Sequence, residues 1–289
     1  MNTKHAILSI VTGLIFVSSG LAQSPTYFMH NGLKFLWETE NKLEVPESVC
    51  YDEDRDLLYI SNISGNPTEK DQNGFISRVS LNGEIKDLKW VEGLNAPKGM
   101  GITGGYLYVT DIDRVHKIDL ESGTVEQTFT VDEAKFLNDI AVRTNGEVYI
   151  SDMVTSKIYR IKNNQIALWL SDEKLNRTNG LFTTANYLYI GMADRIIRTS
   201  YTAKNIENYI QNTVGIDGLE HYQGDSFLFS DWQGRVFIGG PDQKPVKVLD
   251  TRSVKKNAAD IEYSKTYNML FVPTFSANTV AAYEVSAIP

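Results

Sequence analysis

The sequence of 289 residues contains a single cysteine, Cys50, and no cluster of basic residues larger than the pair Lys255–Lys256. One cysteine excludes an intrachain disulfide, so the fold cannot depend on a disulfide framework. The formal net charge is −8. Because an acidic chain without basic clusters repels phosphate groups, we expect neither nucleic acid nor an anionic membrane surface as a partner.

Long hydrophobic runs are also missing, with one exception near the start of the chain. There, an apolar run from Ala6 to Val17 follows Lys4, and small residues lead on to Ala22. A basic start, a short apolar stretch and an end in small residues are typical of a cleaved secretory signal peptide. The alternative is an uncleaved membrane anchor, which we disfavour because the stretch is short for a membrane span and is interrupted by Ser and Gly.

We expect residues 1–22 to be removed as the signal peptide and residues 23–289 to form one domain. With 42% hydrophobic and 11% aromatic residues, the composition is that of an ordinary globular protein. The predicted location is therefore outside the cytoplasm, as a periplasmic or secreted bacterial protein with no membrane span after signal cleavage. We expect it to be a monomer.

Amphipathic helical stripes are absent as well, and short strand-like segments repeat along the chain instead. Each repeat has a short apolar strand, a turn and a second strand that contains an aromatic–aliphatic pair. The first strands begin at Glu47, Lys98, Asn138, Asn179, Asp217 and Ala259, at intervals of 51, 40, 41, 38 and 42 residues. A period near 40 with room for four strands predicts an all-β fold, a six-bladed β-propeller.

The sixth repeat is too short to supply its own fourth strand. After a strand predicted at 279–285, only four residues remain. A sheet left open at this edge would be prone to aggregation. The segment 33–40 precedes the first blade and has no other partner, so we predict that it closes the ring by pairing with 279–285. The long first interval predicts a loop around residues 64–74.

The first strand of each propeller blade lines the central channel, so equivalent positions in different repeats converge there. Four of the six starting positions carry oxygen donors: Glu47, Asn138, Asn179 and Asp217. Two carboxylates and two carboxamides suit one hard divalent cation. The absence of His and Cys from these positions favours Ca²⁺. Mg²⁺ and Mn²⁺ are also possible. Zn²⁺ is the last alternative, and the missing His and Cys disfavour it.

A simpler interpretation is that these residues only shape turns. Asn179-Gly180 and Asp217-Gly218 are turn-forming dipeptides, and the chain uses Asn-Gly freely elsewhere. Glu47 and Asn138, however, hold the same repeat position without a following glycine. Turn chemistry therefore does not explain the whole set, and we favour convergence on the channel.

The segments "PESVCYD", "FLNDIAV", "TNGLF" and "IDGLE", in this order and spacing, resemble the gluconolactonase/regucalcin family, which includes senescence marker proteins and luciferin-regenerating enzymes. The resemblance covers residues 33–285. It implies a six-bladed propeller that binds a divalent metal in its channel and hydrolyses lactones. It also implies Glu47, Asn179 and Asp217 as the main metal ligands, with Asp217 as general base. Asn138 would reach the metal directly or through water and help to hold the substrate.

Two features depart from this pattern: Cys50-Tyr51 replaces the common apolar–Trp pair, which we interpret as a packing change, and Lys98 bears on the site itself. Lys98 begins the second blade, where an ammonium group near a cation would be unfavourable. Lys98 would either bind a carboxylate of the substrate or extend into solvent. We favour the solvent-exposed arrangement because it is the usual behaviour of lysine.

Three further residues are predicted to support the site. Asp139 follows Asn138 and is expected to orient it from behind. Asp260 occupies the same place in the sixth blade, with a similar supporting role. His221 lies four residues after Asp217 and is predicted either to contact substrate at the channel rim as a proton shuttle or to be a structural histidine.

The sequence therefore predicts an exported, divalent-metal-dependent hydrolase of lactones or related cyclic esters, with a small-molecule substrate such as a sugar-derived lactone. A non-catalytic propeller is the alternative, in which the metal is structural and the channel face binds a ligand or a protein. The fold alone does not separate the two, since propellers have many functions.

Overall fold

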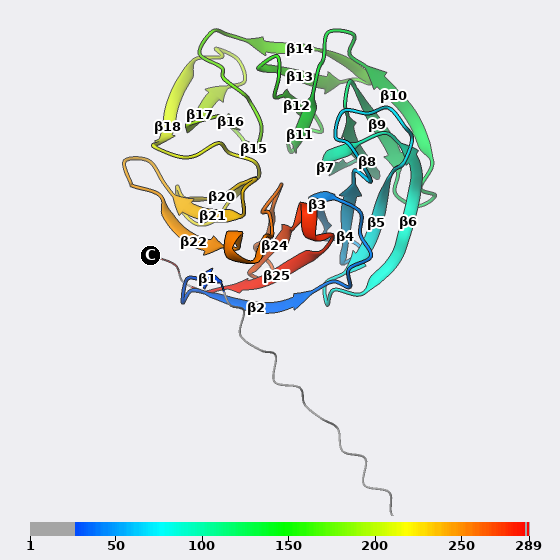
Figure 1. The fold of residues 1–289 in the computed structure, drawn as a ribbon. Helices are drawn as coiled ribbons and strands as arrows, with labels where there is room; N and C mark the ends of the chain where they lie inside the picture. Colours follow the sequence, from blue (N-terminus) through cyan, green and yellow to red (C-terminus); the bar gives the residue numbers. More distant parts are fainter. Residues whose placement is uncertain (1–26, 287, 289) are drawn as a thin grey trace, which may run out of the picture.

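Six antiparallel sheets surround a central axis in the computed structural model, which describes residues 27–286 and 288 (Figure 1). The fold predicted from the repeats, an all-β six-bladed propeller, is confirmed. The predicted signal peptide, residues 1–22, lies outside the described residues. Among the residues described, no helix is long and apolar enough to cross a membrane.

The first three blades each consist of four consecutive strands, ordered from the channel to the rim. Blade 1 contains β3 (Pro46–Asp52), β4 (Leu57–Asn62), β5 (Gly74–Ser80) and β6 (Ile85–Leu94). Blade 2 contains β7 (Pro97–Thr103), β8 (Tyr106–Asp111), β9 (Arg114–Asp119) and β10 (Val125–Thr130). Blade 3 contains β11 (Leu137–Val142), β12 (Val148–Asp152), β13 (Lys157–Lys162) and β14 (Gln165–Ser171).

The last three blades follow the same plan, with additions from the N-terminal segment. Blade 4 contains β15 (Leu181–Thr183), β16 (Tyr187–Gly191), β17 (Arg195–Ser200) and β18 (Ile206–Gln211). Blade 5 contains β19 (Leu219–His221), β20 (Phe227–Asp231), β21 (Arg235–Gly239), β22 (Val246–Asp250) and, at its outer edge, β1 (Phe28–Met29). Blade 6 contains β23 (Glu262–Ser264), β24 (Met269–Pro273), β25 (Val280–Val285) and β2 (Leu33–Glu38). Two short 3₁₀ helices, η1 (Arg252–Val254) and η2 (Phe275–Ala277), precede β23 and β25.

The predicted ring closure is confirmed by the pairing of β2 with β25. The two strands run antiparallel, with Leu33 opposite Val285. In addition, β1 pairs with β22 of blade 5, which was not predicted. The N-terminal segment therefore bridges the seam between the last two blades. Trp37 of β2 extends this connection to blade 1, because its indole Nε1 donates a hydrogen bond to the carbonyl of Leu81 at 2.8 Å.

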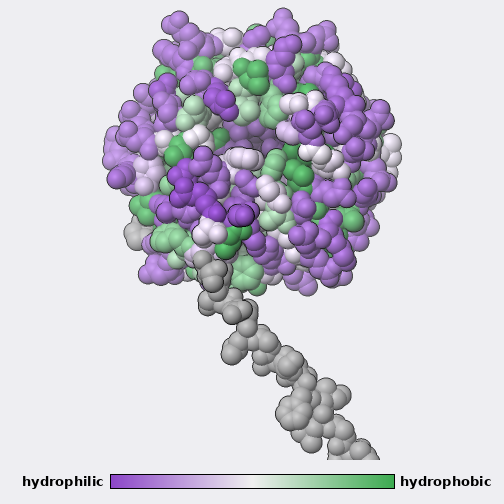
Figure 2. Space-filling view, viewed as in Figure 1, coloured by the Kyte–Doolittle hydropathy of each residue, from purple (hydrophilic) through white to green (hydrophobic). Residues whose placement is uncertain are grey.

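The second strand of each blade explains the repeated aromatic–aliphatic pairs. Strands β12 and β20 are buried along their whole length, and the other four second strands are buried except at their first residue, because each sheet is packed between two neighbouring sheets. The core is accordingly divided into clusters between adjacent blades. One cluster, for example, packs Val115 and Phe129 of blade 2 against Ile140 and Val148 of blade 3. The face seen in Figure 2 is largely hydrophilic at its rim, with hydrophobic residues interspersed toward the centre.

Glycines near the channel allow the inner strands to approach one another. A Cβ atom added to Gly180 would lie 2.4 Å from the carbonyl oxygen of Asp217, and one added to Gly218 would lie 2.3 Å from the backbone nitrogen of Ile261. Neither glycine has a positive φ, whereas Gly83 and Gly146 do, at 86° and 82°. The Asn-Gly pairs at 82–83 and 145–146 therefore form turns, and the glycines after Asn179 and Asp217 serve close packing of blades instead.

We predict that Gly218→Ala lowers the free energy of unfolding by about 1–3 kcal/mol, because backbone must move to admit the added methyl group. The control is Gly215→Ala, whose Cβ would meet nothing closer than the carbonyl oxygen of Ala193 at 3.8 Å. Urea denaturation of both variants measures the difference. Equal stability of the two variants would contradict the packing argument.

Candidate metal and active site

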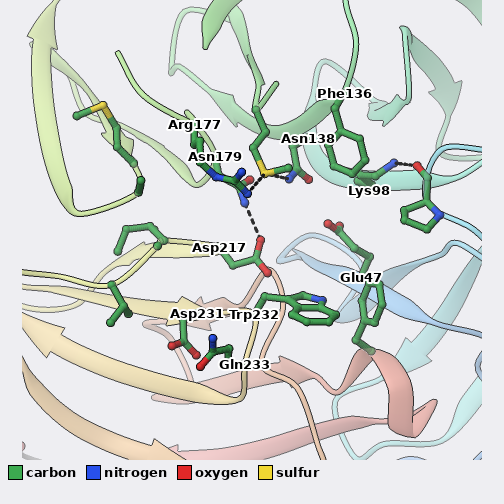
Figure 3. A pocket seen from close by; sticks show the side chains of 18 of the residues that line it. Glu47, Lys98, Phe136, Asn138, Arg177, Asn179, Asp217, Asp231, Trp232 and Gln233 are labelled. Carbon is green, nitrogen blue, oxygen red and sulfur yellow. Dashed lines mark hydrogen bonds between the residues drawn. The ribbon is translucent and has the colours of Figure 1, made fainter. Parts of the chain in front are cut away.

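A cavity of about 800 Å³ opens on the face of the propeller where the inner strands begin. The four predicted metal ligands, Glu47, Asn138, Asn179 and Asp217, all line it, and they come from four different blades. Figure 3 shows their side chains directed toward a common space. The predicted convergence of these residues is present in the structure.

Backbone irregularities place three of the lining residues. Glu47, Lys98 and Asn138 each lie at a break in register between the first and second strands of their blade. Such bulges redirect a side chain and leave backbone groups without their ladder partners. Hydroxyl groups of the second strand satisfy two of these groups. The Oγ atoms of Ser61 and Ser151 each accept a hydrogen bond, both at 3.0 Å, from the backbone nitrogens of Ser48 and Asp139.

Carboxylates at the ends of second strands hold the loops that lead into the site. The carboxylate of Asp152 accepts hydrogen bonds from the backbone nitrogens of Lys135, at 2.8 Å, and Phe136, at 3.3 Å, directly before the strand that carries Asn138. Asp111 does the same for the loop before Lys98. An aspartate that ends a second strand, such as Asp152 or Asp231, is expected from the sequence to satisfy backbone groups of a turn rather than to bind a ligand, and Asp152 does so.

Glu47 lacks a partner for one of its oxygens. Its side chain is buried, with 5% of the residue exposed, and Oε2 forms no hydrogen bond within the described residues. Burial raises the pKa of this carboxyl well above its ordinary value, and the charges of Asp217 and Asp260 raise it further. A buried carboxylate oxygen without a partner is costly, so the site is suited to bind a cation there.

Two more of the four predicted metal ligands, Asp217 and Asn179, contact each other. The side-chain amide of Asn179 donates a hydrogen bond to Asp217 Oδ1 at 2.8 Å. Burial raises the pKa of Asp217 to about 7, although this hydrogen bond opposes the shift. Within the described residues, the side chain of Asn138 forms one hydrogen bond, from Nδ2 to the sulfur of Met153 at 4.0 Å, which leaves its side-chain oxygen Oδ1 available.

These donors fit a hard divalent cation better than zinc. No group of three or more His, Cys, Asp or Glu side chains within residues 27–286 and 288 is arranged to hold a metal ion. A cation at this cavity would therefore depend on two carboxylates together with carboxamide oxygens. Oxygen-only sets of this kind suit Ca²⁺, Mg²⁺ or Mn²⁺.

The preference for a solvent-exposed Lys98 was wrong. Lys98 is only 1% exposed, and its ammonium group donates hydrogen bonds to the carbonyls of Ala96, at 2.8 Å, and Pro67, at 3.1 Å. The same nitrogen lies 4.5 Å from the centre of the Phe136 ring. Burial lowers the pKa of Lys98 to about 8, while the nearby charges of Glu47 and Asp111 favour the protonated form. Lys98 thus anchors the predicted long loop, which runs between β4 and β5, over the cavity.

The structure does not bring His221 to the cavity. His221 is the last residue of β19, and at about 3.3 Å per residue it lies roughly 13 Å along the chain from Asp217. Its Nε2 is 2.8 Å from the carbonyl of Gly224, and its Nδ1 is 2.7 Å from the ammonium nitrogen of Lys265. It is a structural residue at the opposite end of the blade, so the prediction that it contacts substrate was wrong.

The supporting roles predicted for Asp139 and Asp260 also need correction. Asp139 does not contact the side chain of Asn138; its carboxylate accepts hydrogen bonds from the backbone nitrogens of Ile140 and Leu181. Asp260 accepts a hydrogen bond from Ser48 Oγ at 2.6 Å. Both residues therefore connect neighbouring blades, since Asp139 joins blade 3 to blade 4 and Asp260 joins blade 6 to blade 1.

Comparison with known proteins identifies similar structures and no similar sequence. No protein-family model matches the chain, and no curated protein does. A catalytically inactive virginiamycin B lyase from Staphylococcus aureus with quinupristin is 12% identical, with a TM-score of 0.61 over 88% of this chain and 99% of the lyase. The shared feature is the fold.

Two further structures show how widely this propeller is used. A protein described as a "putative gluconolactonase" is 14% identical, with a TM-score of 0.63 over 89% of this chain and 94% of its own. A chain of a nidogen–laminin complex is 17% identical, with a TM-score of 0.56 over 72% of this chain and 88% of its own. The fold therefore occurs in enzymes and in a protein–protein complex, and the site itself must decide the function.

Carboxyl groups continue along the channel below the cavity. Glu220, Asp260 and Glu262 are partly accessible to water but are enclosed by protein, and burial raises the pKa of each. For Glu262 the pKa rises to about 7, although the backbone nitrogen of Tyr51 donates to its carboxylate at 3.1 Å. The folded protein therefore retains a proton that the unfolded chain releases at a lower pH.

We predict that the metal-free protein loses stability as the pH rises from about 4.5 to 7, because over this window the folded state binds more protons than the unfolded state. Glu262→Gln removes one of these protons and should reduce the difference between the melting temperatures at pH 5 and pH 8. The control is Glu284→Gln, at an exposed ion pair with Lys34. The idea fails if both variants retain the wild-type pH dependence in thermal denaturation with chelator.

Proposed function

We propose that this protein is a divalent-metal-dependent hydrolase of lactones or related cyclic esters. The observation that carries the proposal is that Glu47 Oε2 has no hydrogen-bond partner in the part of the chain that the structure describes, at a cavity also lined by Asp217, Asn138 and Asn179. When bound there, a divalent cation would supply Lewis-acid polarisation of the ester carbonyl and stabilise the oxyanion. Ca²⁺ is our first candidate because the donors are all oxygen.

Asp217 is the proposed general base. Its Oδ1 is held by the amide of Asn179, so Oδ2 is the oxygen that would accept a proton from the attacking water. Burial raises the pKa of Asp217 to about 7 in the protein without a cation, and the charge of a bound cation would lower this pKa, so that the carboxylate is ionised near neutral pH. Asn138 would orient the substrate through its side-chain oxygen Oδ1, while its side-chain nitrogen Nδ2 contacts the sulfur of Met153.

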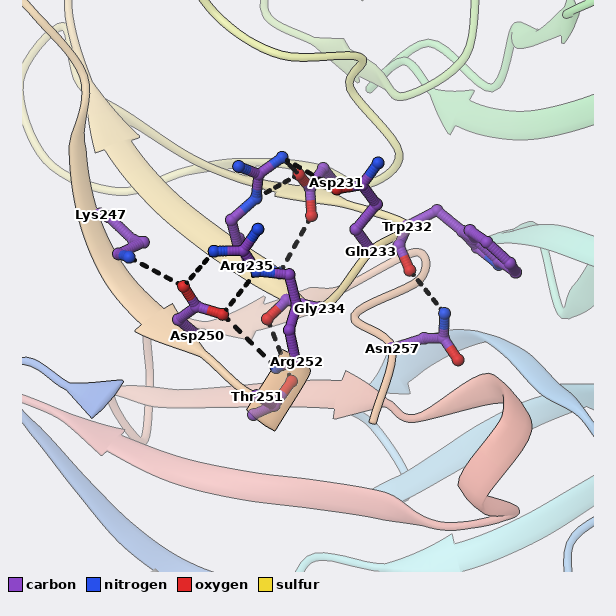
Figure 4. Close-up of polar contacts among 10 residues, drawn as sticks. All are labelled: Asp231, Trp232, Gln233, Gly234, Arg235, Lys247, Asp250, Thr251, Arg252 and Asn257. Carbon is purple, nitrogen blue, oxygen red and sulfur yellow. Dashed lines mark hydrogen bonds and ion pairs between the residues drawn. The ribbon is translucent and has the colours of Figure 1, made fainter. Parts of the chain in front are cut away.

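The walls of the cavity are suited to enclose a small ester. Phe136, Met192 and Ile216 supply apolar surface that limits access of bulk water. Trp232 is 51% exposed at the mouth, with its ring edge-on to Phe275 at 5.5 Å. Its position is fixed from behind, since its backbone carbonyl accepts a hydrogen bond from Asn257 Nδ2 at 2.8 Å (Figure 4).

Two alternatives lead to different expectations. A lyase mechanism that depends on histidine is not favoured: the inactive virginiamycin B lyase has alanine in place of one histidine, whereas no histidine among the described residues lines this cavity. A non-catalytic propeller with a structural metal remains the second candidate. An enclosed metal would favour that role, whereas the cavity here is open at the mouth and large enough for a small molecule.

Asp217→Asn should reduce metal-dependent lactone hydrolysis by at least about 100-fold, because the amide cannot take up the proton from water. The side chain keeps its shape, so the melting temperature should change little. Asp225→Asn, on the exposed turn of the same blade, serves as control. The measurement is a pH-stat assay on sugar and aliphatic γ- and δ-lactones, and wild-type activity in Asp217→Asn would rule out this assignment.

Glu47→Gln should weaken binding of the activating cation by at least about tenfold, because it removes one of two negative charges from the donor set. The same change should raise the melting temperature of the chelated protein at pH 8, where the buried carboxylate has no partner. Calorimetric titration with Ca²⁺, Mg²⁺ and Mn²⁺ measures the first effect. Unchanged affinity for each ion would exclude Glu47 as a ligand.

A further inference from the structure

We infer that the substrate carries a carboxylate beside its reactive ester and that Arg177 recognises this group. The inference rests on the proposed function, since it names the substrate class of the same cavity. Arg177 lies in the loop that leads into blade 4, two residues before Asn179, and it lines the cavity. A guanidinium group can donate two parallel hydrogen bonds to a carboxylate.

Three cationic side chains line the cavity, and two of them are already occupied. Lys98 donates to two backbone carbonyls. Arg235 is paired with Asp231, whose Oδ2 accepts a hydrogen bond from its Nε at 2.6 Å (Figure 4). Arg177, in contrast, forms no ion pair with any carboxylate of residues 27–286 or 288. Of the three, it is the cation whose side chain has no carbonyl or carboxylate partner among these residues.

The backbone of Arg177 is held in place by a hydrogen bond, although its side chain is exposed. Its backbone nitrogen donates to Ser156 Oγ at 2.8 Å, which attaches the loop to blade 3. The guanidinium Nη2 contacts the sulfur of Met153 at 3.9 Å. A thioether is a weak acceptor, so exchanging this contact for a carboxylate costs little.

The same sulfur connects Arg177 to the candidate catalytic group. Asn138 Nδ2 and Arg177 Nη2 both point at Met153 Sδ, at 4.0 and 3.9 Å (Figure 3). A ligand held by the guanidinium therefore lies about the width of one side chain from Asn138. This spacing fits a small lactone whose carboxylate is on a short substituent of the ring, and it does not require a long chain between the two groups.

Charge also favours a carboxylate over a doubly charged phosphate. With the divalent cation bound, its two positive charges balance the carboxylates of Glu47 and Asp217, so a second negative charge on the ligand would have no partner in the cavity beyond Arg177. A neutral lactone would leave Arg177 without a counter-charge. A single carboxylate matches the single charge of Arg177.

Two lactones that differ only in the required group provide the test. D-glucaro-1,4-lactone carries a carboxylate where D-glucono-1,4-lactone carries a hydroxymethyl group. We expect the wild-type protein, with its activating cation, to show a kcat/KM at least about tenfold higher for the acid lactone. Arg177→Gln should remove this preference by lowering the value for the acid lactone alone.

The matched control is Arg252→Gln, which removes an arginine that pairs with Asp250 and does not line the cavity (Figure 4). This control separates a local contact from the general loss of one positive charge. Equal kcat/KM for the two lactones, or a wild-type preference that survives Arg177→Gln, would overturn the inference. An identical loss in Arg252→Gln would do the same.

Failure of the hydrolase proposal gives a different result. If neither lactone is hydrolysed with any divalent cation, the hydrolase proposal fails. The protein then does not consume either lactone during a binding measurement. Their binding can then be measured by calorimetry and by the fluorescence of the protein, which includes the mouth residue Trp232. Tighter binding of the acid lactone that is lost in Arg177→Gln supports carboxylate recognition by a binding protein. Equal binding of both lactones overturns it.

Discussion

Carboxyl groups that converge on one narrow channel are the constraint on which the rest of this structure depends. Inner strands from the blades bring together Glu47, Asp139, Asp217, Glu220, Asp260 and Glu262, and burial raises the pKa of every one of them. The groups around these carboxyls compensate for their burial. Backbone nitrogens donate to Asp139 and Glu262, and the hydroxyl of Ser48 donates to Asp260. Lys98 provides a buried positive charge, and Glu47 and Asp217 face an open cavity that a cation would fit.

The repeat pattern was sufficient to predict the fold and the closing strand. Period, strand count and the missing fourth strand are all properties of chain order, and propeller geometry converts them directly into positions in space. The same geometry predicted that Glu47, Asn138, Asn179 and Asp217 would meet. It did so because equivalent positions in a ring converge whatever their separation in the sequence.

The remaining details depended on direction and on partners distant in the sequence. Asp139 is adjacent to Asn138, but its carboxylate accepts a hydrogen bond from the backbone nitrogen of Leu181 in the next blade, a partner 42 residues away in the sequence. His221 ends β19, the inner strand that begins two residues after Asp217, and this strand carries it away from the cavity. The burial of Lys98 depends on Pro67, a loop residue that no repeat pattern connects to it.

The N-terminal strands β1 and β2, which pair with blades 5 and 6, also determine the order in which the molecule can fold. The phenolic hydroxyls of Tyr27 and Tyr283 are 2.7 Å apart although 256 residues separate them along the chain. Each blade closes mainly through local hairpins, whereas this seam closes only when the last strand is available. Until β2 pairs with it, the outer edge of β25 is unpaired. Closure of the ring is therefore the expected slow step of folding, and the interval before it is the time at which two chains could exchange their first strands.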